Sequence, residues 1–172
     1  MKAQKKVLTG LGIVALAGGI LAGCSTSVEE VSKDSGAKQE TTQKSEDKTY
    51  SVGDTVKVNG LEVTITKASY TSPSEYTPAN KGKVLTLEVA TNNTGDSAFI
   101  DNTEFNLYDK EGNQLEQYFG YDELAISGDV NKGKKLSGKL FFDVPESDSY
   151  ELIYKPSISF DDKEIKFEIK PQ

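Results

Sequence analysis

The chain has 172 residues, of which 27 are acidic and 20 are basic, and its formal net charge at pH 7 is −7. All of the basic residues are lysines, and an acidic chain without arginine lacks the clustered cations that binding to nucleic acid requires. Histidine is absent, which excludes the usual serine, cysteine and zinc hydrolase mechanisms because they need an imidazole base or ligand.

The first segment has the parts of an export signal. Lys2, Lys5 and Lys6 form a basic start, and an uncharged apolar stretch runs from Val7 to Ile20. At about 14 residues this stretch is shorter than the roughly 20 that a permanent membrane-spanning helix needs. A cleaved signal peptide over residues 1–23 is therefore predicted. The alternatives are an uncleaved anchor or an ordinary secretory signal with an incidental cysteine.

The signal ends in Leu21-Ala22-Gly23-Cys24, which resembles a bacterial lipobox. The resemblance implies that diacylglycerol is attached to the sulfur of Cys24 and that a peptidase cuts between Gly23 and Cys24. A protein with two acyl chains stays bound to the membrane, whereas a protein with a single chain dissociates. The predicted location is the extracytoplasmic face of the cell membrane. Cys24 is also the only cysteine, so an intrachain disulfide is excluded.

Residues 24–49 contain the lipidated cysteine and a predicted linker. Val28, Val31 and Ala37 are its only aliphatic side chains, too few to offset the entropy of ordering the segment. We expect a disordered tether with a root-mean-square reach of roughly 25 to 30 Å. Ser35 and Lys38 match the Ser-x-x-Lys spacing of penicillin-binding enzymes, but the companion motifs are missing from the sequence, so the match is interpreted as fortuitous.

From residue 50 onward, short apolar-polar alternations are separated by Gly, Asn, Asp and Pro, which is the pattern of strands and turns. Asn59-Gly60 is the strongest short hairpin signal, and a two-residue turn pairs Val58 with Leu61. Further strands are predicted at Leu85–Val89, Phe105 with Leu107, Leu136–Val144, Tyr150–Tyr154 and Ile165–Ile169. Turns are predicted at Asn92–Gly95, Asp109–Asn113, Gly128–Lys135, Pro145–Ser149 and Asp161–Lys163. Short strands with one apolar face each predict an all-β, two-layer sandwich over residues 50–172.

Three segments carry a more specific resemblance. Tyr50–Val56, Gly133–Pro145 and Tyr150–Tyr154 resemble the telokin-like, immunoglobulin-fold domain of unknown function that many Gram-positive lipoproteins carry. The resemblance covers residues 50–170. It implies an immunoglobulin-like antiparallel β-sandwich outside the cytoplasm, and it brings no known catalytic residues with it.

Catalysis and metal binding are not predicted. A pair of carboxylates could hydrolyse a glycoside, so a carboxylate-based enzyme acting on cell-wall polymer is the alternative from another functional class. Alternating Glu and Lys on strands is nevertheless typical of a solvated face. Asp109, Glu111 and Asn113 place oxygen atoms at alternate positions, as a calcium loop does, but the closing glutamate is not at the required spacing. An ordinary hairpin turn is favoured, and no cofactor is expected.

Two aromatic segments are the candidates for binding. Tyr118, Phe119 and Tyr121 surround a glycine, and Tyr76 lies in the long segment 70–82. Aromatic residues are enriched at interface hot spots, but they also seal the cores of sandwiches, and packing is the favoured interpretation of the two. Simple antiparallel strands would place these segments at opposite ends of the sandwich, with the aromatic cluster beside the predicted hairpin turn.

The sequence therefore predicts a membrane-anchored lipoprotein that presents an immunoglobulin-like domain for non-catalytic binding or adhesion. The membrane is contacted through the diacylglycerol on Cys24, and a cell-envelope protein or glycan is the expected partner. An accessory lipoprotein that assists a neighbouring envelope complex is the alternative within binding.

Overall fold

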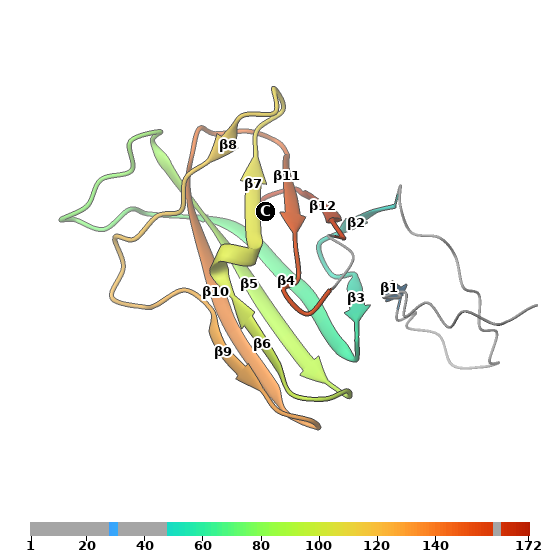
Figure 1. Cartoon of the computed structure of the whole chain (residues 1–172). Helices are drawn as coiled ribbons and strands as arrows, with labels where there is room; N and C mark the ends of the chain where they lie inside the picture. Colours follow the sequence, from blue (N-terminus) through green and yellow to red (C-terminus); the bar gives the residue numbers. More distant parts are fainter. Residues whose placement is uncertain (1–27, 31–47, 160–162) are drawn as a thin grey trace, which may run out of the picture.

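A computed structural model of the chain describes residues 28–30, 48–159 and 163–172 (Figure 1). The predicted signal peptide and Cys24 lie outside the described residues, as do residues 31–47 of the predicted linker and Asp161 and Asp162 of a predicted turn. Among the described residues, no helix is long and apolar enough to cross a membrane.

The strands form two five-stranded sheets and one two-stranded sheet in the described part of the chain. Sheet A contains, in spatial order, β1 (Val28–Glu30), β3 (Thr55–Val58), β4 (Leu61–Thr71), β5 (Lys83–Asn93) and β10 (Lys135–Val144). Sheet B contains β2 (Thr49–Ser51), β12 (Ile165–Ile169), β11 (Tyr150–Tyr154), β7 (Phe105–Tyr108) and β8 (Gln114–Leu115). The small sheet pairs β6 (Ala98–Asp101) with β9 (Ser127–Val130), and a short 3-10 helix, η1, spans Asn102–Glu104.

Sheets A and B pack face to face around one apolar core. β12 shows the alternation behind this arrangement, because Ile165, Phe167 and Ile169 are buried while Lys166 and Glu168 are exposed. The largest fully buried side chains come from strands of all three sheets: Tyr154, Phe105, Phe142, Phe167, Leu61, Ile65, Leu85, Leu87, Ile100, Leu107, Leu140 and Leu152. Burying one side chain of this kind contributes about 1.5–3 kcal/mol. The predicted β-sandwich is confirmed.

The strand order is that of an immunoglobulin sandwich. β4, β5 and β10 are neighbours in sheet A, as strands A, B and E are in that fold, and β7, β11 and β12 are neighbours in sheet B, as strands C, F and G are. Tyr150 supplies a tyrosine corner. It opens β11, and its hydroxyl donates a hydrogen bond to the carbonyl of Pro145 just upstream.

The hairpin predicted at Asn59-Gly60 is confirmed together with its register. Asn59 has a φ of 48° and Gly60 a φ of 88°, and positive φ at both central residues is what a type I′ turn requires. Val58 pairs with Leu61, and both side chains are fully buried. The turn thus delivers the apolar faces of β3 and β4 to the same side of sheet A.

The structure departs from the predicted pattern at several short elements. β2 pairs with β12 in parallel orientation, so sheet B is not purely antiparallel; the ring of Tyr50 in β2 lies 5.7 Å from that of Phe167. β9 overlaps the turn predicted at Gly128–Lys135; its sequence does not predict a strand, because it carries a single apolar residue. β5 likewise extends to Asn93, into the turn predicted at Asn92–Gly95. β1 lies inside the predicted linker and pairs antiparallel with β3.

Asn93 closes the end of the sandwich near the hairpin turn. Its side chain is fully buried at the end of β5. The Nδ2 atom donates hydrogen bonds to the carbonyls of Asp96 at 2.5 Å and Val130 at 2.6 Å, and the Oδ1 atom accepts one from the N–H of Gly95 at 2.9 Å. This one side chain therefore ties the loop between β5 and β6 to β9.

Two buried tyrosines differ in how their hydroxyl groups are satisfied. The Tyr150 hydroxyl donates to Pro145 and lies 2.8 Å from the hydroxyl of Tyr70. The Tyr154 hydroxyl is buried and has no hydrogen-bond partner among the described residues. Burial raises the pKa of both hydroxyls, with a hydrogen bond to Tyr70 adding to the effect at Tyr150 and the charge of Glu104 adding to it at Tyr154.

Tyr154→Phe is expected to raise the free energy of unfolding by about 1 kcal/mol, because it removes a buried hydroxyl that has no partner. Tyr150→Phe is the matched control and is expected to lower it by about 1 kcal/mol, because satisfied hydrogen bonds are lost. Above the ordinary tyrosine pKa of 10.0 the unfolded chain releases these protons first, so the wild-type fold loses stability as pH rises. The difference in free energy of unfolding between Tyr154→Phe and wild type should therefore increase as the pH rises above 10.0.

Equilibrium urea unfolding, followed by tyrosine fluorescence at neutral pH and above pH 10, measures both variants. A Tyr154→Phe protein less stable than wild type at neutral pH would contradict the assignment of an unsatisfied hydroxyl.

Candidate binding site

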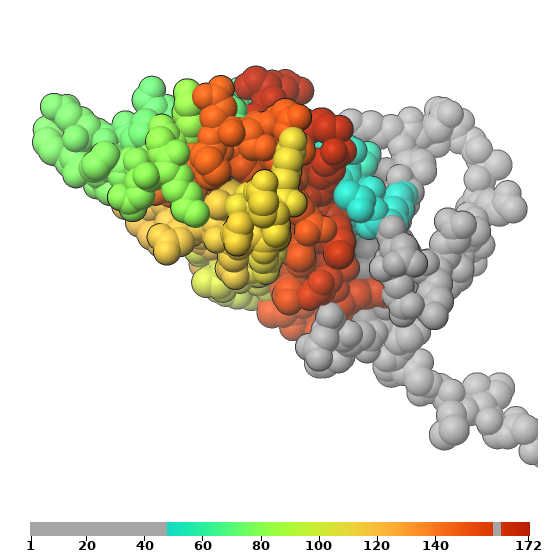
Figure 2. Space-filling model, turned by 90° about the horizontal axis from the view of Figure 1, so that it is seen from above, coloured from blue at the N-terminus to red at the C-terminus, as the bar shows by residue number. Residues whose placement is uncertain are grey.

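Two loops lie together at one end of the sandwich and form the candidate site. One is the β4–β5 loop, residues 72–82, and the other is the β8–β9 segment, residues 116–126. Both project to the left of the sheets in Figure 1, whereas β2 and β3 lie on the right. Figure 2 shows the same separation from above, with the green β4–β5 loop and the cyan start of the domain on opposite sides. The loops are thus remote from the strand that opens the domain.

Tyr118 and Tyr121 hold the two loops together. The hydroxyl of Tyr118 accepts a hydrogen bond from the N–H of Ser74 at 2.7 Å and donates one to the carbonyl of Thr77. The hydroxyl of Tyr121 donates to the carbonyl of Ser72 at 2.6 Å. Both tyrosine side chains of the β8–β9 segment therefore bind backbone atoms of the β4–β5 loop.

The prediction that the two aromatic segments lie at opposite ends of the sandwich is wrong. The β8–β9 segment runs along the edge of β10, where the N–H of Tyr118 donates to the carbonyl of Phe141 at 2.8 Å and the N–H of Ile126 donates to the carbonyl of Lys139 at 2.9 Å. The Phe141 end of β10 lies beside the start of β5. The aromatic residues are therefore brought to the β4–β5 loop, at the end of β4 opposite the hairpin turn.

Tyr118 and Tyr121 also pack against the outer face of sheet A. Val84 and Phe141 alternate with core residues and so face outward, and with Tyr118 they form a second, smaller buried cluster. The ring of Tyr121 meets those of Tyr118 and Phe141 edge-to-face, at centroid distances of 5.1 and 4.9 Å. Packing against sheet A therefore sets the position of both loops.

Asp143 anchors the β4–β5 loop from β10. Its carboxylate is buried and accepts hydrogen bonds from the N–H groups of Asn80 at 2.6 Å and Lys81 at 2.8 Å. Such an anchor is not recognisable in the sequence, because an acidic residue on the outward side of a strand is usually solvated. The sequence signal that is available is Phe141, two positions before Asp143. Its large apolar side chain faces outward, so another segment of the chain must cover this end of the sheet.

The same loops expose three large apolar side chains. Tyr76 in the β4–β5 loop is 89% exposed, and Phe119 and Leu124 in the β8–β9 segment are 77% and 86% exposed. Within the described residues the remaining exposed large apolar side chain is Phe99 of β6, at 46%. Concentrated exposure of this kind is typical of contact surfaces.

The four predicted binding residues thus have two different environments. Tyr118 and Tyr121 fix the loops, whereas Tyr76 and Phe119 are open to a partner. Leu124 is not predictable as a surface residue, because the apolar positions of its segment fit neither the strand period nor the helix period.

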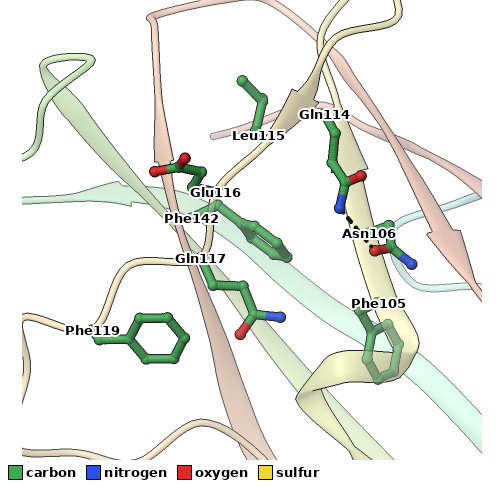
Figure 3. A pocket seen from close by; sticks show the side chains of 8 residues that line it. All are labelled: Phe105, Asn106, Gln114, Leu115, Glu116, Gln117, Phe119 and Phe142. Carbon is green, nitrogen blue, oxygen red and sulfur yellow. Dashed lines mark hydrogen bonds between the residues drawn. The ribbon is translucent and has the colours of Figure 1, made fainter.

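A shallow, open hollow of about 600 Å³ lies beside Phe119, between β10 of sheet A and β7 and β8 of sheet B (Figure 3). Its lining residues are Phe105, Asn106, Gln114, Leu115, Glu116, Gln117, Phe119 and Phe142. Phe105, Leu115 and Phe142 are buried core residues and form an apolar floor. The polar side chains and the Phe119 ring form the walls.

Amide side chains dominate the polar part of this lining. Gln114 Nε2 donates to Asn106 Oδ1 at 3.0 Å, which is the dashed line in Figure 3. Gln117 Nε2 donates to the carbonyl of Asn102 at 2.9 Å, and Gln117 Oε1 accepts a hydrogen bond from the Nδ2 atom of Asn102. Glu116 is the single carboxylate of the lining, which contains no lysine.

Among the described residues are acidic and turn residues that the sequence suggests for a metal ion or a glycosidase. They contain no group of three or more His, Cys, Asp or Glu side chains placed to hold a metal ion. At the predicted turn, the Asp109 carboxylate accepts hydrogen bonds from the side chain and N–H of Asn113 and from the N–H of Glu111, and those from Asn113 chiefly lower the pKa of Asp109. The hollow offers one carboxylate, not the pair that a glycosidase uses.

Comparison with known proteins identifies relatives over the folded part of the chain. Residues 50–165 match a family described as a domain of unknown function, DUF4352. The uncharacterized lipoprotein YjhA of Bacillus subtilis strain 168 is 25% identical over 134 residues, which is 67% of this chain and 63% of that protein. The matched part therefore spans less than two thirds of the relative's length.

Two crystal structures of Bacillus subtilis proteins have a similar fold. That of YcdA, which is named as a lipoprotein, is 32% identical with a TM-score of 0.56 and covers 65% of this chain and 37% of the other. That of YjhA is 24% identical with a TM-score of 0.55 and covers 72% and 99%, respectively. The sandwich is thus common to these proteins.

Proposed function

Because the chain belongs to the DUF4352 family of domains of unknown function, with relatives that are named as lipoproteins, we propose that it is a lipid-anchored protein that binds a component of the cell envelope without catalysis. The proposed location is the extracytoplasmic face of the cell membrane. The telokin-like subtype of the domain is part of this proposal, and the resemblance at Tyr50–Val56 and Gly133–Pro145 supports it.

Cys24→Ala tests the anchor. The variant is expected to leave the membrane pellet for the soluble fraction and to lose incorporation of a labelled fatty acid, because two acyl chains are what holds the protein at the bilayer. Ser25→Ala, which changes the next residue and leaves the sulfur in place, is the control and should stay in the pellet. Continued labelling of the Cys24→Ala protein would contradict lipidation at this position.

The pairing of β1 with β3 supports a compact arrangement at the membrane. Three residues separate Cys24 from Val28, and an extended chain spans at most about 3.6 Å per residue. The edge of sheet A to which β1 is paired therefore lies within about 14 Å of the anchored residue. The β4–β5 loop and the β8–β9 segment lie on the side of the molecule opposite β1 (Figure 1), so an anchor close to β1 would leave both loops facing outward.

The exposure of Tyr76 and Leu124 carries the binding proposal. Both side chains lie on loops that Tyr118, Tyr121 and Asp143 already hold in place. A partner therefore contacts them without having to order the loops, and that ordering is otherwise a cost of association.

Replacing Tyr76 and Leu124 together by serine is expected to weaken binding to the envelope by about tenfold or more, because a few apolar anchors carry most of the energy of an interface. The probes are isolated cell walls and membrane vesicles of the bacterium that makes the protein, sedimented with the mature Cys24→Ala chain. Phe99→Ser, which removes the exposed apolar side chain of β6, is the control. Equal binding by the double variant and its parent would contradict the proposal.

A further inference from the structure

We propose that the hollow beside Phe119 binds a neutral saccharide. The inference rests on the proposed function, because it names the chemical class of the envelope component that this surface would recognise. It concerns the eight lining residues described above and is independent of Tyr76 and Leu124, which do not line the hollow.

The charge of the lining excludes the anionic ligands common in cell envelopes. Glu116 is the single charged side chain among the eight residues, and it is acidic. Phosphate, nucleotides and anionic lipid headgroups would find no cation here and would be repelled by that carboxylate. The hollow therefore suits an uncharged ligand.

The polar groups of the lining match hydroxyl groups. Asn and Gln side chains each present two donors and a carbonyl acceptor, and a sugar hydroxyl needs a donor and an acceptor at the same place. The bond between Gln114 and Asn106 uses one N–H and one oxygen. Gln114 Oε1 and Asn106 Nδ2 make no hydrogen bond within the described part of the chain, so this amide pair keeps one acceptor and one donor for a ligand.

Phe119 supplies an apolar face at the rim of the hollow. Its ring is 77% exposed and lies across the hollow from Asn106 in Figure 3. The C–H groups on one face of a pyranose carry partial positive charge and stack on the negative face of an aromatic ring. A pyranose has an apolar face and polar edges, and the hollow offers an aromatic ring for the face and amide groups for the edges.

The backbone on both sides of Phe119 is fixed before any ligand arrives. Tyr118 is buried and is hydrogen-bonded to Ser74. A Cβ atom at Gly120 would collide with the hydroxyl of Tyr118, so glycine is required for this close approach. Gln117, the preceding member of the lining, is held by Asn102. The site is therefore preorganised, which lowers the cost of binding.

Titration of the mature Cys24→Ala chain, followed by backbone amide NMR, tests the proposal. The probes are oligomers of N-acetylglucosamine, oligomers of glucose and, as the anionic comparison, inorganic phosphate. We expect saccharide-dependent shifts at Asn106, Gln114 and Phe119 and no shifts there with phosphate. The two saccharides distinguish an N-acetylated wall glycan from an unsubstituted glucan.

Phe119→Ala is expected to weaken saccharide binding about tenfold, a typical loss when an aromatic anchor is truncated. It should leave the thermal unfolding temperature unchanged, because the ring is exposed. Gln114→Ala is the second variant, and Phe99→Ala, which removes an exposed phenyl ring from β6, is the matched control that should bind as the parent does.

Absence of shifts with every saccharide would overturn the inference, and so would shifts that persist unchanged in Phe119→Ala and Gln114→Ala. Envelope binding that remains sensitive to Tyr76 and Leu124 while no saccharide binds would overturn the saccharide inference alone. Saccharide binding in a protein whose envelope attachment does not depend on Tyr76 and Leu124 would instead refute the loop surface and support the hollow.

Discussion

Gly60→Ala is expected to lower the free energy of unfolding by about 3 kcal/mol, the sum of a left-handed backbone penalty and a steric clash. Gly60 has a φ of 88°. A Cβ atom at this position would lie 2.5 Å from the Cα and 2.6 Å from the nitrogen of Gly95. Because both are backbone atoms, no side-chain rotation relieves the clash, and the hairpin turn must separate from the loop between β5 and β6.

Gly53→Ala is the matched control for this prediction. Gly53 has a φ of 98°, and a Cβ atom there would meet nothing within 4 Å. This variant carries the backbone penalty without the clash and should lose only about 1 kcal/mol. Equilibrium urea unfolding by tyrosine fluorescence measures both variants, since the chain has no tryptophan. An equal decrease in the free energy of unfolding of the two variants would show that the close approach of Gly60 to Gly95 does not contribute to stability.

Asn93→Ala is expected to cost about 3 kcal/mol as well. The substitution removes the partner of the buried carbonyl of Val130 and of two groups of the adjoining loop, at Gly95 and Asp96. Each lost hydrogen bond has a net value of about 1 kcal/mol, and a buried polar group left without a partner adds a desolvation penalty. The loop between β5 and β6 is expected to detach from β9.

Asn92→Ala separates this effect from a general effect of asparagine at the end of β5. The side chain of Asn92 is half-buried and donates to the Glu62 carboxylate at 2.8 Å, so its loss should cost below about 1 kcal/mol. Hydrogen exchange at the Gly95 amide should accelerate in Asn93→Ala and not in Asn92→Ala. If Gly95 stays protected in both variants, Asn93 does not hold the loop.

The strands that could be predicted are those whose apolar residues repeat with period two. β3, β4, β10, β11 and β12 each place several apolar side chains on the core face, so burial and backbone geometry indicate the same structure. β2 and β9 each have one buried apolar residue, Tyr50 and Val130. Their pairing is decided by partners distant in sequence, which no local pattern contains.

The residue types of the candidate site could be predicted from the sequence, but not the meeting of its two loops at one end of the sandwich. Aromatic residues at Tyr76 and Phe119 mark two contact-prone loops, and the structure brings these loops together. Their meeting depends on the β8–β9 segment following the edge of β10, which the outward-facing Phe141 and the buried Asp143 make favourable. Phe141 indicates that this end of the sheet needs a cover, but no local pattern identifies the segment that supplies it, so the path of the β8–β9 segment could not be inferred.

The position of β12 in sheet B determines when the domain can fold. Among the described strands β12 is the last along the chain, yet it lies between β2 and β11. During synthesis from the N-terminus, β2 and β11 therefore have no common neighbour, and the core lacks Phe167, until residues 165–169 have emerged. Pairings between such distant segments form slowly. A polypeptide with this topology therefore completes sheet B only after residues 165–169 have left the ribosome.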